Sequence, residues 1–533
     1  MNSRILTIAA FVMGVASLPF AAEERINTDI NARIREEAMQ RSQLMRTLHF
    51  LTDVYGPRLT GSPSHKAAGE WAVKTMEGWG MKNGHLEPWD FGHPGWTNDL
   101  AWGAITAPVK DTLVLEVLAW TPGTKGIAHG KAVNIVIPDQ PTADELAAYL
   151  NTIKDQVRGA IVLVGKPRAV PVNLAPPAKR NTDDDVKARY DPNNPNAGQR
   201  GRGGRGLQTP RPGAIPARQL AQQINQFLVD NGALVRVNDA GREHGQIIAF
   251  DNTTYDLTKA VPTVVVRNED YGRIVRILDD GVAVELEFNI VNRIYPEGRT
   301  SYNTIGEIPG TDKKDEVVML GGHLDSWHSA TGATDNAIGC SIMMEAARIL
   351  MKLGVQPRRT IRVALGSGEE EGILGSQAYV KEHFGSFEAQ KPEYTKLVAY
   401  LNIDTGTGQL RGASVFGPAP AAAALREILA PFQDLGIYGA ATSRSRVVAG
   451  TDSTAFNNAG LPGIGFQQDP IEYNTHTHHT NLDTYERVIE EDVKKAAVIV
   501  ASTIYHLAMR DEMLARFAAS DMPAPPPPRA AGQ

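Results

Sequence analysis

The chain has 533 residues, of which 42% are hydrophobic and 21% are charged, a composition typical of a folded globular protein. This length exceeds one ordinary hydrophobic core and predicts about two or three domains. The net charge of -6 argues against a nucleic-acid partner, because such proteins carry a concentrated basic face. The single cysteine, Cys340, excludes an intramolecular disulfide and a Cys-based zinc site.

The N-terminal segment has the pattern of an export signal. Arg4 precedes an apolar run over residues 5–20, and Ala21 and Ala22 offer small residues for cleavage. We therefore expect residues 1–22 to be a signal peptide and the mature protein to be periplasmic or extracellular. A membrane anchor is the alternative, but an apolar run of about sixteen residues is short for a spanning helix. We expect no stable membrane insertion after processing.

Two helical segments and then short strands follow. Residues 27–49 and 64–79 have apolar positions at helical spacing, on either side of a turn-rich stretch. Residue 126 begins a region, ending near 293, of short strands joined by long polar connections. The segments we expect before residue 300 are strands at 112–118, 132–137, 159–164 and 261–266, and a helix at 217–230.

A low-complexity stretch interrupts this middle region at residues 176–212. It contains the Arg-Gly run of residues 199–206, which in other settings binds RNA. In an acidic, exported chain a flexible solvated loop is the better interpretation. The Pro-rich residues 513–533 predict a disordered tail.

From about residue 300 strands and helices alternate, which predicts an α/β fold: a mixed, mostly parallel sheet flanked by helices. Functional sites in such folds lie beyond the carboxyl ends of the strands. The predicted strands are 317–320, 360–365, 397–403 and 463–466, and the predicted helices are 336–352, 377–384, 421–429 and 486–509.

Side chains able to bind metal follow these strands one after another. Each has an ordinary alternative by itself: Asp335 could cap a helix, and Asp404 could form a salt bridge. Together they supply enough ligands for a pair of metal ions and a general base. The sequence therefore predicts a metallohydrolase. The residues are His323, Asp335, Glu369, Glu370, Asp404 and His479.

Neighbouring residues have predicted supporting roles. Asp325 lies two residues after His323, on the same face of an extended segment, so its carboxylate can accept a hydrogen bond from the non-ligating ring nitrogen. Asp483 can orient His479 in the same way. His478 is adjacent and free for another task.

Five motifs in this order resemble the M28 family of co-catalytic zinc exopeptidases. The resemblance covers roughly residues 40–120 and 295–510, and residues 56–62 (GPRLTGS) are similar to that family's N-terminal signature. The five motifs are residues 323–325 (HLD), 335–339 (DNAIG), 369–376 (EEEGILGS), 402–404 (NID) and 479–484 (HTNLDT).

The resemblance implies a zinc-exopeptidase fold in two parts, residues 23–125 and 294–512, with an inserted β-rich protease-associated-type domain at 126–293, as in the carboxypeptidase Q-like branch. It also implies two Zn²⁺ ions. One would be held by His323 and Asp404 and the other by Glu370 and His479, with Asp335 bridging both.

Glu369 would then be the general base that activates water, and His478, where some relatives have Tyr, would donate to the oxyanion. We expect a peptide or dipeptide substrate and no nucleic acid. The inserted domain has two candidate roles: limiting access to short peptides, or forming a homodimer contact.

Several points stay open. An M20-like di-zinc amidohydrolase, a one-zinc glutaminyl cyclase and a receptor-like protein without catalysis are the alternatives. The substrate's free amine would need a carboxylate, for which Glu371 and Asp452 are candidates. A free carboxylate would need a cation, for which Arg444 and Arg446 are candidates.

Overall fold

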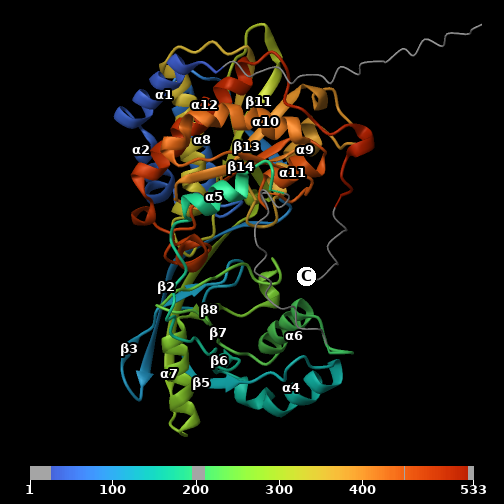
Figure 1. Cartoon of the computed structure of the whole chain (residues 1–533). Coiled ribbons are helices and arrows are strands. Elements are labelled where there is room, and N and C mark those ends of the chain that lie inside the picture. The colour runs from blue at the N-terminus through green and yellow to red at the C-terminus, as the bar shows by residue number, and fades with distance from the viewer. Residues whose placement is uncertain (1–25, 195–210, 449, 526–533) are drawn as a thin grey trace, which may run out of the picture.

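A computed structural model describes residues 26–194, 211–448 and 450–525. Two eight-stranded sheets, each covered by helices, form an upper and a lower part in Figure 1. The predicted signal peptide and the Arg-Gly run lie outside the described residues.

The first sheet carries the metal-competent residues. Its order is β1-β10-β12-β11-β13-β16-β14-β15, and the four neighbours β12, β11, β13 and β16 run parallel. The strands are β1 (Lys82–Asp90), β10 (Thr300–Ile308), β11 (Lys313–His323), β12 (Arg359–Gly366), β13 (Leu397–Asn402), β14 (Leu410–Phe416), β15 (Ala440–Ser443) and β16 (Gly463–Gln468).

Helices pack on both faces of this sheet, which confirms the predicted α/β fold. One face is covered by α1 (Thr28–Gln40), α2 (Leu44–His49), α3 (Pro63–Gly78), α8 (Ile338–Lys352), α10 (Ala419–Leu429) and α12 (Glu490–Met509). The other is covered by α9 (Leu374–His383) and α11 (Ser453–Asn458). The sequence of α8 is apolar nearly all round, and its residues 338–350 are buried, as expected for a helix enclosed by others.

The second sheet begins earlier than predicted. Its order is β3-β2-β9-β5-β6-β7-β8-β4, and the long strands β2 and β9 pair antiparallel along its edge. β2 begins at Gly95 and pairs with β9, so it belongs to the inserted part of the molecule. The predicted boundary at residue 126 is therefore about thirty residues too late. The strands are β2 (Gly95–Ala107), β3 (Asp111–Thr112), β4 (Leu115–Val117), β5 (Ala128–Ile135), β6 (Ile161–Val164), β7 (Val235–Asp239), β8 (Thr263–Val266) and β9 (Glu285–Tyr295).

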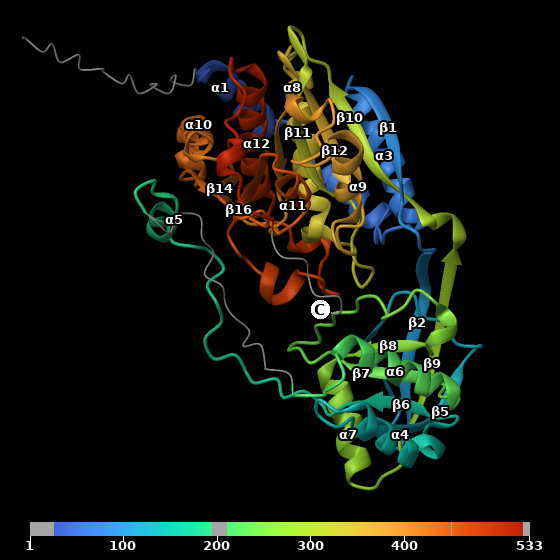
Figure 2. The same ribbon diagram turned by 90° about the vertical axis from the view of Figure 1, so that its right-hand side faces the viewer.

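Two short connections join the parts. Residues 91–94 lead from β1 to β2, and residues 296–299 lead from β9 back to β10, so the second part is an insertion between paired strands (Figure 2). The helices α4 (Ala143–Val157), α6 (Ala217–Asp230) and α7 (Asn268–Asp279) accompany its sheet. The helix predicted at 217–230 has the same bounds as α6.

One helix of the insertion lies elsewhere. α5 (Asp183–Tyr190) falls inside the predicted flexible loop, yet it packs beside the first sheet, where Val186 and Tyr190 are buried against Ala441. Thr182 caps it, its side chain accepting a hydrogen bond from the Asp185 N–H. Only two side chains of this helix are buried, so its sequence is mostly polar and shows no clear apolar periodicity. This is why the segment was predicted to be a loop.

The C-terminal segment is also more ordered than predicted. Leu514 is buried in the main core, and the ring of Phe517 packs edge-on against Phe416 at 5.2 Å between centroids. These apolar anchors explain why residues 513–525 follow a defined course, whereas residues 526–533 lie outside the described part. Within the described ranges, no helix has both the length and the hydropathy to cross a membrane.

Candidate metal centre

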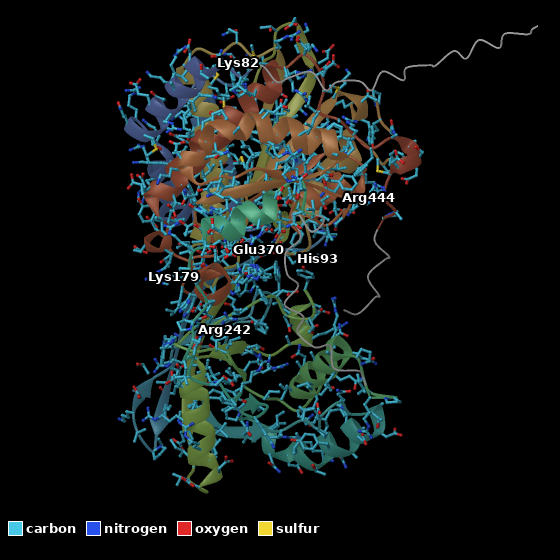
Figure 3. The ribbon with its side chains drawn as sticks, in the orientation of Figure 1. Lys82, His93, Lys179, Arg242, Glu370 and Arg444 are labelled. Atoms are coloured by element: carbon cyan, nitrogen blue, oxygen red, sulfur yellow. The ribbon has the colours of Figure 1, made fainter. Side chains whose placement is uncertain are left out.

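The six metal-competent residues meet at the carboxyl edge of the parallel strands. His323 is the last residue of β11, Glu369 and Glu370 follow β12, and Asp404 follows β13. His479 lies in the turn beyond β16. Figure 3 places Glu370 at the junction between the two parts of the molecule. The parallel topology therefore brings together side chains that are up to 156 residues apart in sequence (479 − 323 = 156).

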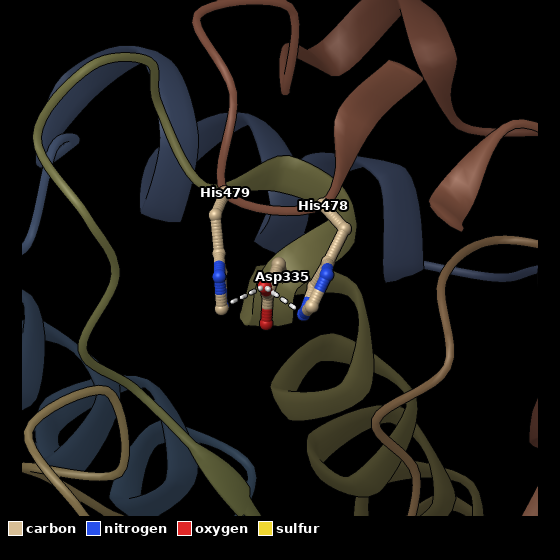
Figure 4. Close-up of side chains that lie close together, drawn as sticks. All are labelled: Asp335, His478 and His479. Carbon is tan, nitrogen blue, oxygen red and sulfur yellow. Dashed lines mark ion pairs between the residues drawn. The ribbon is translucent and has the colours of Figure 1, made fainter. Parts of the chain in front are cut away.

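Asp335 lies at the centre of the cluster. It belongs to the turn Ala333–Ala337, directly before α8, and its own backbone angles there are not helical. Its Oδ1 is 3.2 Å from His323 Nε2. Its Oδ2 is 3.2 Å from His479 Nε2, and Figure 4 shows this contact beside the longer one to His478. One carboxylate thus faces two imidazoles, one with each oxygen.

Each imidazole has a second acidic neighbour. His323 Nε2 lies 3.4 Å from Asp404 Oδ1, and His479 Nε2 lies 2.9 Å from Glu370 Oε2. The cluster therefore consists of two groups, one on each side of Asp335. Carboxylate oxygens and imidazole nitrogens converging in this way are typical zinc ligands.

Buried charge indicates that a cation belongs here. Burial lowers the pKa of His323, but the charges of Asp404 and Asp335 outweigh it and leave that pKa well above its usual value. For His479 burial is again outweighed, here by Glu370 and Asp335, and the pKa is raised to about 11. The carboxylates thus favour a positive charge at both rings. A metal ion bound to the same nitrogens would supply that charge in place of a proton.

Unpartnered atoms support the same conclusion. Among the described residues, His323 Nε2 and Asp335 Oδ2 are buried at ion-pair distance from their neighbours but form no well-aligned hydrogen bond. A buried polar atom without a partner is costly unless a ligand satisfies it. Both atoms point into the cluster, so these side chains fit a bound metal.

Glu369 lines an adjacent cavity of about 620 Å³ together with Asp335, Asp404 and His479. Burial, followed by the charges of neighbouring carboxylates, holds the pKa of Glu369 well above its usual value. A carboxylate of this kind can accept and return a proton near neutral pH.

Asp325 supports the cluster differently from the prediction. His323 Nδ1 lies 3.1 Å from the backbone carbonyl of Asp325, while the Asp325 carboxylate is 3.7 Å away. That carboxylate instead accepts hydrogen bonds from Thr60 Oγ1 and from the Glu370 N–H, both at 3.2 Å. The backbone carbonyl orients the histidine, and the carboxylate fixes the turn after β12.

Asp483 likewise holds backbone rather than the ring of His479. Its carboxylate accepts the N–H groups of Thr334 at 2.6 Å and Asp335 at 3.0 Å. The predicted contact with His479 is replaced because two consecutive amides of the turn before α8 point at this carboxylate. Asp483 therefore positions the central carboxylate of the cluster.

Sequence reasoning gave Arg58 no role, although it lies in the GPRLTGS signature. It is fully buried, and its guanidinium donates only to carbonyls: to Leu324 and Leu51 at 2.6 Å, to Thr331 at 2.8 Å and to Gly332 at 3.0 Å. These bonds tie the N-terminal segment to the loop between β11 and the central carboxylate. A buried arginine surrounded by carbonyls explains what the signature does for the site.

His478 lies beside His479, with ring centroids 3.7 Å apart, and its Nε2 is 3.7 Å from Asp335 Oδ2. It lines the cavity and is 41% exposed, so it is accessible to a substrate. Tyr473, which the sequence did not indicate, packs on the His478 ring and places its hydroxyl 3.4 Å from Asp404 Oδ1.

The candidates for substrate-end recognition lie elsewhere. Arg444 donates to the Asp521 carbonyl, and Arg446 donates to the Pro523 carbonyl, so both hold the C-terminal segment. Asp452 is fully buried, with its carboxylate beside Gly366 at the end of β12. None of these three lines the cavity, and neither does Glu371.

Comparison with known proteins agrees with this geometry. Residues 303–504 match the sequence profile of peptidase family M28. This segment of the chain belongs to peptidase family M28. It is 25% identical to carboxypeptidase Q of Rattus norvegicus over 94% of this chain and 92% of the relative, and 24% identical to carboxypeptidase Q of Homo sapiens over the same shares. The M28 match favours this family over the M20-like alternative.

Solved structures show the same fold. The chain superposes on a peptidase M28 precursor from Shewanella amazonensis with a TM-score of 0.63 and 23% identity, covering 91% of this chain and 97% of the other. It superposes on a zinc aminopeptidase from Bacillus subtilis with a TM-score of 0.53 and 17% identity, covering 90% and 97%. The fold of an M28 zinc exopeptidase therefore extends over both parts of the molecule.

Proposed function

We propose that this M28 peptidase is a di-zinc exopeptidase that cleaves terminal peptide bonds of short peptides or dipeptides. The observation that carries the proposal is the Asp335 carboxylate, whose two oxygens face His323 and His479 at 3.2 Å each. A carboxylate placed between two ligand groups suits a metal pair.

His323 and Asp404 would hold one zinc, and Glu370 and His479 the other, with Asp335 shared. When bound, the zinc ions would supply Lewis acidity to a water molecule and to the scissile carbonyl. Glu369 accepts the proton of the attacking water and later delivers it to the leaving amine. His478, exposed to the cavity, donates a hydrogen bond to the oxygen that gains negative charge.

Metal analysis and peptide cleavage test the proposal together. Purified protein should contain two zinc ions per chain, cleave free dipeptides, and lose activity with a chelator and regain it with zinc. H323F and H479F should each lose zinc. A single ion with unaltered activity would contradict the metal pair, and chelator-resistant cleavage would contradict the metallopeptidase.

We also propose that the protein is exported and that residues 1–22 are removed. The support is the basic, apolar and small-residue order of that segment. Cell fractionation with N-terminal sequencing tests this, and an intact N-terminus on the cytoplasmic protein would contradict it.

A further inference from the structure

The insertion sends one segment across to the M28 part of the molecule. Figure 2 shows α5 beside β14, far from the second sheet to which its flanking residues lead. Asp183 forms an ion pair with Arg411 and accepts a hydrogen bond from the Tyr438 hydroxyl at 2.8 Å. The helix is therefore fastened at its first turn as well as through its buried apolar side.

The residues just before α5 are fastened too. Arg180 lies 3.2 Å from Asp469 and 2.8 Å from Asp492, and both of these carboxylates are buried. The Asn181 N–H donates to the same Asp469 at 2.9 Å. Although the Arg180 side chain is itself 45% exposed, its two buried partners and the Asn181 bond hold this segment against the first sheet, so α5 has a defined place relative to the cavity.

From this position Arg189 lines the cavity that also contains Asp335, Glu369 and Asp404. Among the described residues lining that cavity, it is the single Lys or Arg side chain. It is partly exposed and forms no hydrogen bond or ion pair with another described residue. Its guanidinium does not neutralise the acidic cluster, because none of those carboxylates is within ion-pair distance.

We propose that Arg189 is the specificity residue that binds the C-terminal carboxylate of the substrate. This rests on the proposed peptidase function. A guanidinium presents parallel N–H donors that match a carboxylate, and in a partly enclosed cavity such a pair discriminates strongly against a neutral amide. The cavity of about 620 Å³ is of the size that takes small ligands.

This assignment gives a functional reason for the position of α5 beside the first sheet. With the scissile carbonyl at the metal cluster and the terminal carboxylate at Arg189, the cavity selects dipeptides and other very short peptides with a free C-terminus. The insertion then supplies one wall of the substrate site, while the strand ends of the first sheet supply the chemistry.

The test compares R189M with K187M on three substrates: Ala-Ala, Ala-Ala-amide and Ala-Glu-amide. Lys187 is on the same helix, over the Tyr438 ring, and is absent from the cavity lining, so K187M controls for loosening of α5. R189M should lower kcat/KM for Ala-Ala by about 10- to 100-fold, mainly through KM, and leave both amides within about twofold. R189K should be intermediate, and zinc content should not change.

Equal losses on all three substrates, or no loss on Ala-Ala, would overturn the proposal. A loss confined to Ala-Glu-amide would also overturn it, because the carboxylate recognised would then be a side chain. Failure of the peptidase function has a separate signature: wild-type protein would show no chelator-sensitive cleavage of any of the three.

Discussion

At the scale of single residues, three adjacent glutamates have different surroundings. Glu369 lines the cavity, Glu370 lies 2.9 Å from His479, and the Glu371 carboxylate is buried away from both. Successive side chains along this tight turn point in different directions. That difference, rather than residue type, separates the proposed base from the proposed ligand. The three positions therefore predict three different mutant phenotypes.

E369Q should lower kcat by about 10²- to 10⁴-fold, because the amide cannot accept the proton of the attacking water. Zinc content should stay at the wild-type level, since Glu369 is outside the proposed ligand set. E371Q is the matched control and should keep most activity. Wild-type turnover by E369Q would remove Glu369 from the mechanism.

His478 and His479 offer a second contrast between neighbours. H478F should retain zinc and lose about 10- to 100-fold in kcat, as expected on removing one donor to the developing oxyanion. H479F should lose metal. If H478F also loses zinc, His478 is a ligand, which its 3.7 Å approach to Asp335 would permit.

R58M should destabilise the protein by at least about 3 kcal/mol, because four carbonyls, three of them in buried hydrogen bonds, lose their donor at once. Urea unfolding measures the change, and zinc content should fall with it as the loop before Asp335 loosens. R46M, at an exposed site over the Phe50 ring, is the control. Wild-type stability in R58M would show that Arg58 does not anchor this loop.

At the scale of elements, β1 and α9 are joined by a titratable contact. His383 Nε2 lies 3.0 Å from Glu87 Oε1, and this hydrogen bond raises the pKa of His383 above 6.5, against the opposing effect of burial. Glu393 raises this pKa further and Arg362 lowers it. A raised histidine pKa means that folding favours the protonated ring.

The stability from this contact is fully present below the unfolded pKa near 6.5 and is lost as pH rises through the higher folded pKa. A double-mutant cycle with H383Q and E87Q should therefore show coupling of about 1 kcal/mol or less at low pH and almost none at about pH 9. Equal coupling at both pH values would contradict the assignment.

At the scale of the whole molecule, the metal centre joins segments that are distant in sequence. Removing zinc would leave four buried or partly buried carboxylates and two histidines to neutralise one another. We expect a chelator to lower Tm by about 4 °C. A metal whose dissociation constant is about a thousandfold below its free concentration stabilises by roughly 4 kcal/mol, and the unfolding entropy of a chain this long is about 1 kcal/mol per degree. Differential scanning calorimetry measures this shift, and an unchanged Tm would contradict a contribution of the metals to the stability of the fold.

The alternating pattern after residue 300 was predictable because each strand is a short apolar run that recurs at regular intervals. The insertion was harder, since β2 and β9 are long, half-exposed strands whose pairing partners are nearly 200 residues apart. The signal for α5 was present: Thr182, then three aspartates, then Lys187 and Arg189 form a cap with charges in helical order. The low-complexity residues on either side outweighed this signal, so the segment was predicted to be a loop.

The sequence by itself determined which chemical groups the site would contain, because ligand residues directly after apolar strands are a local pattern. Only the tertiary structure decided how those groups are shared: that Asp335 faces two histidines, that the Asp325 and Asp483 carboxylates hold backbone, and that a helix of the insertion brings Arg189 to the cavity. Each of these depends on contacts between segments far apart in the chain. Such contacts are set by packing and buried charge, which local spacing does not encode.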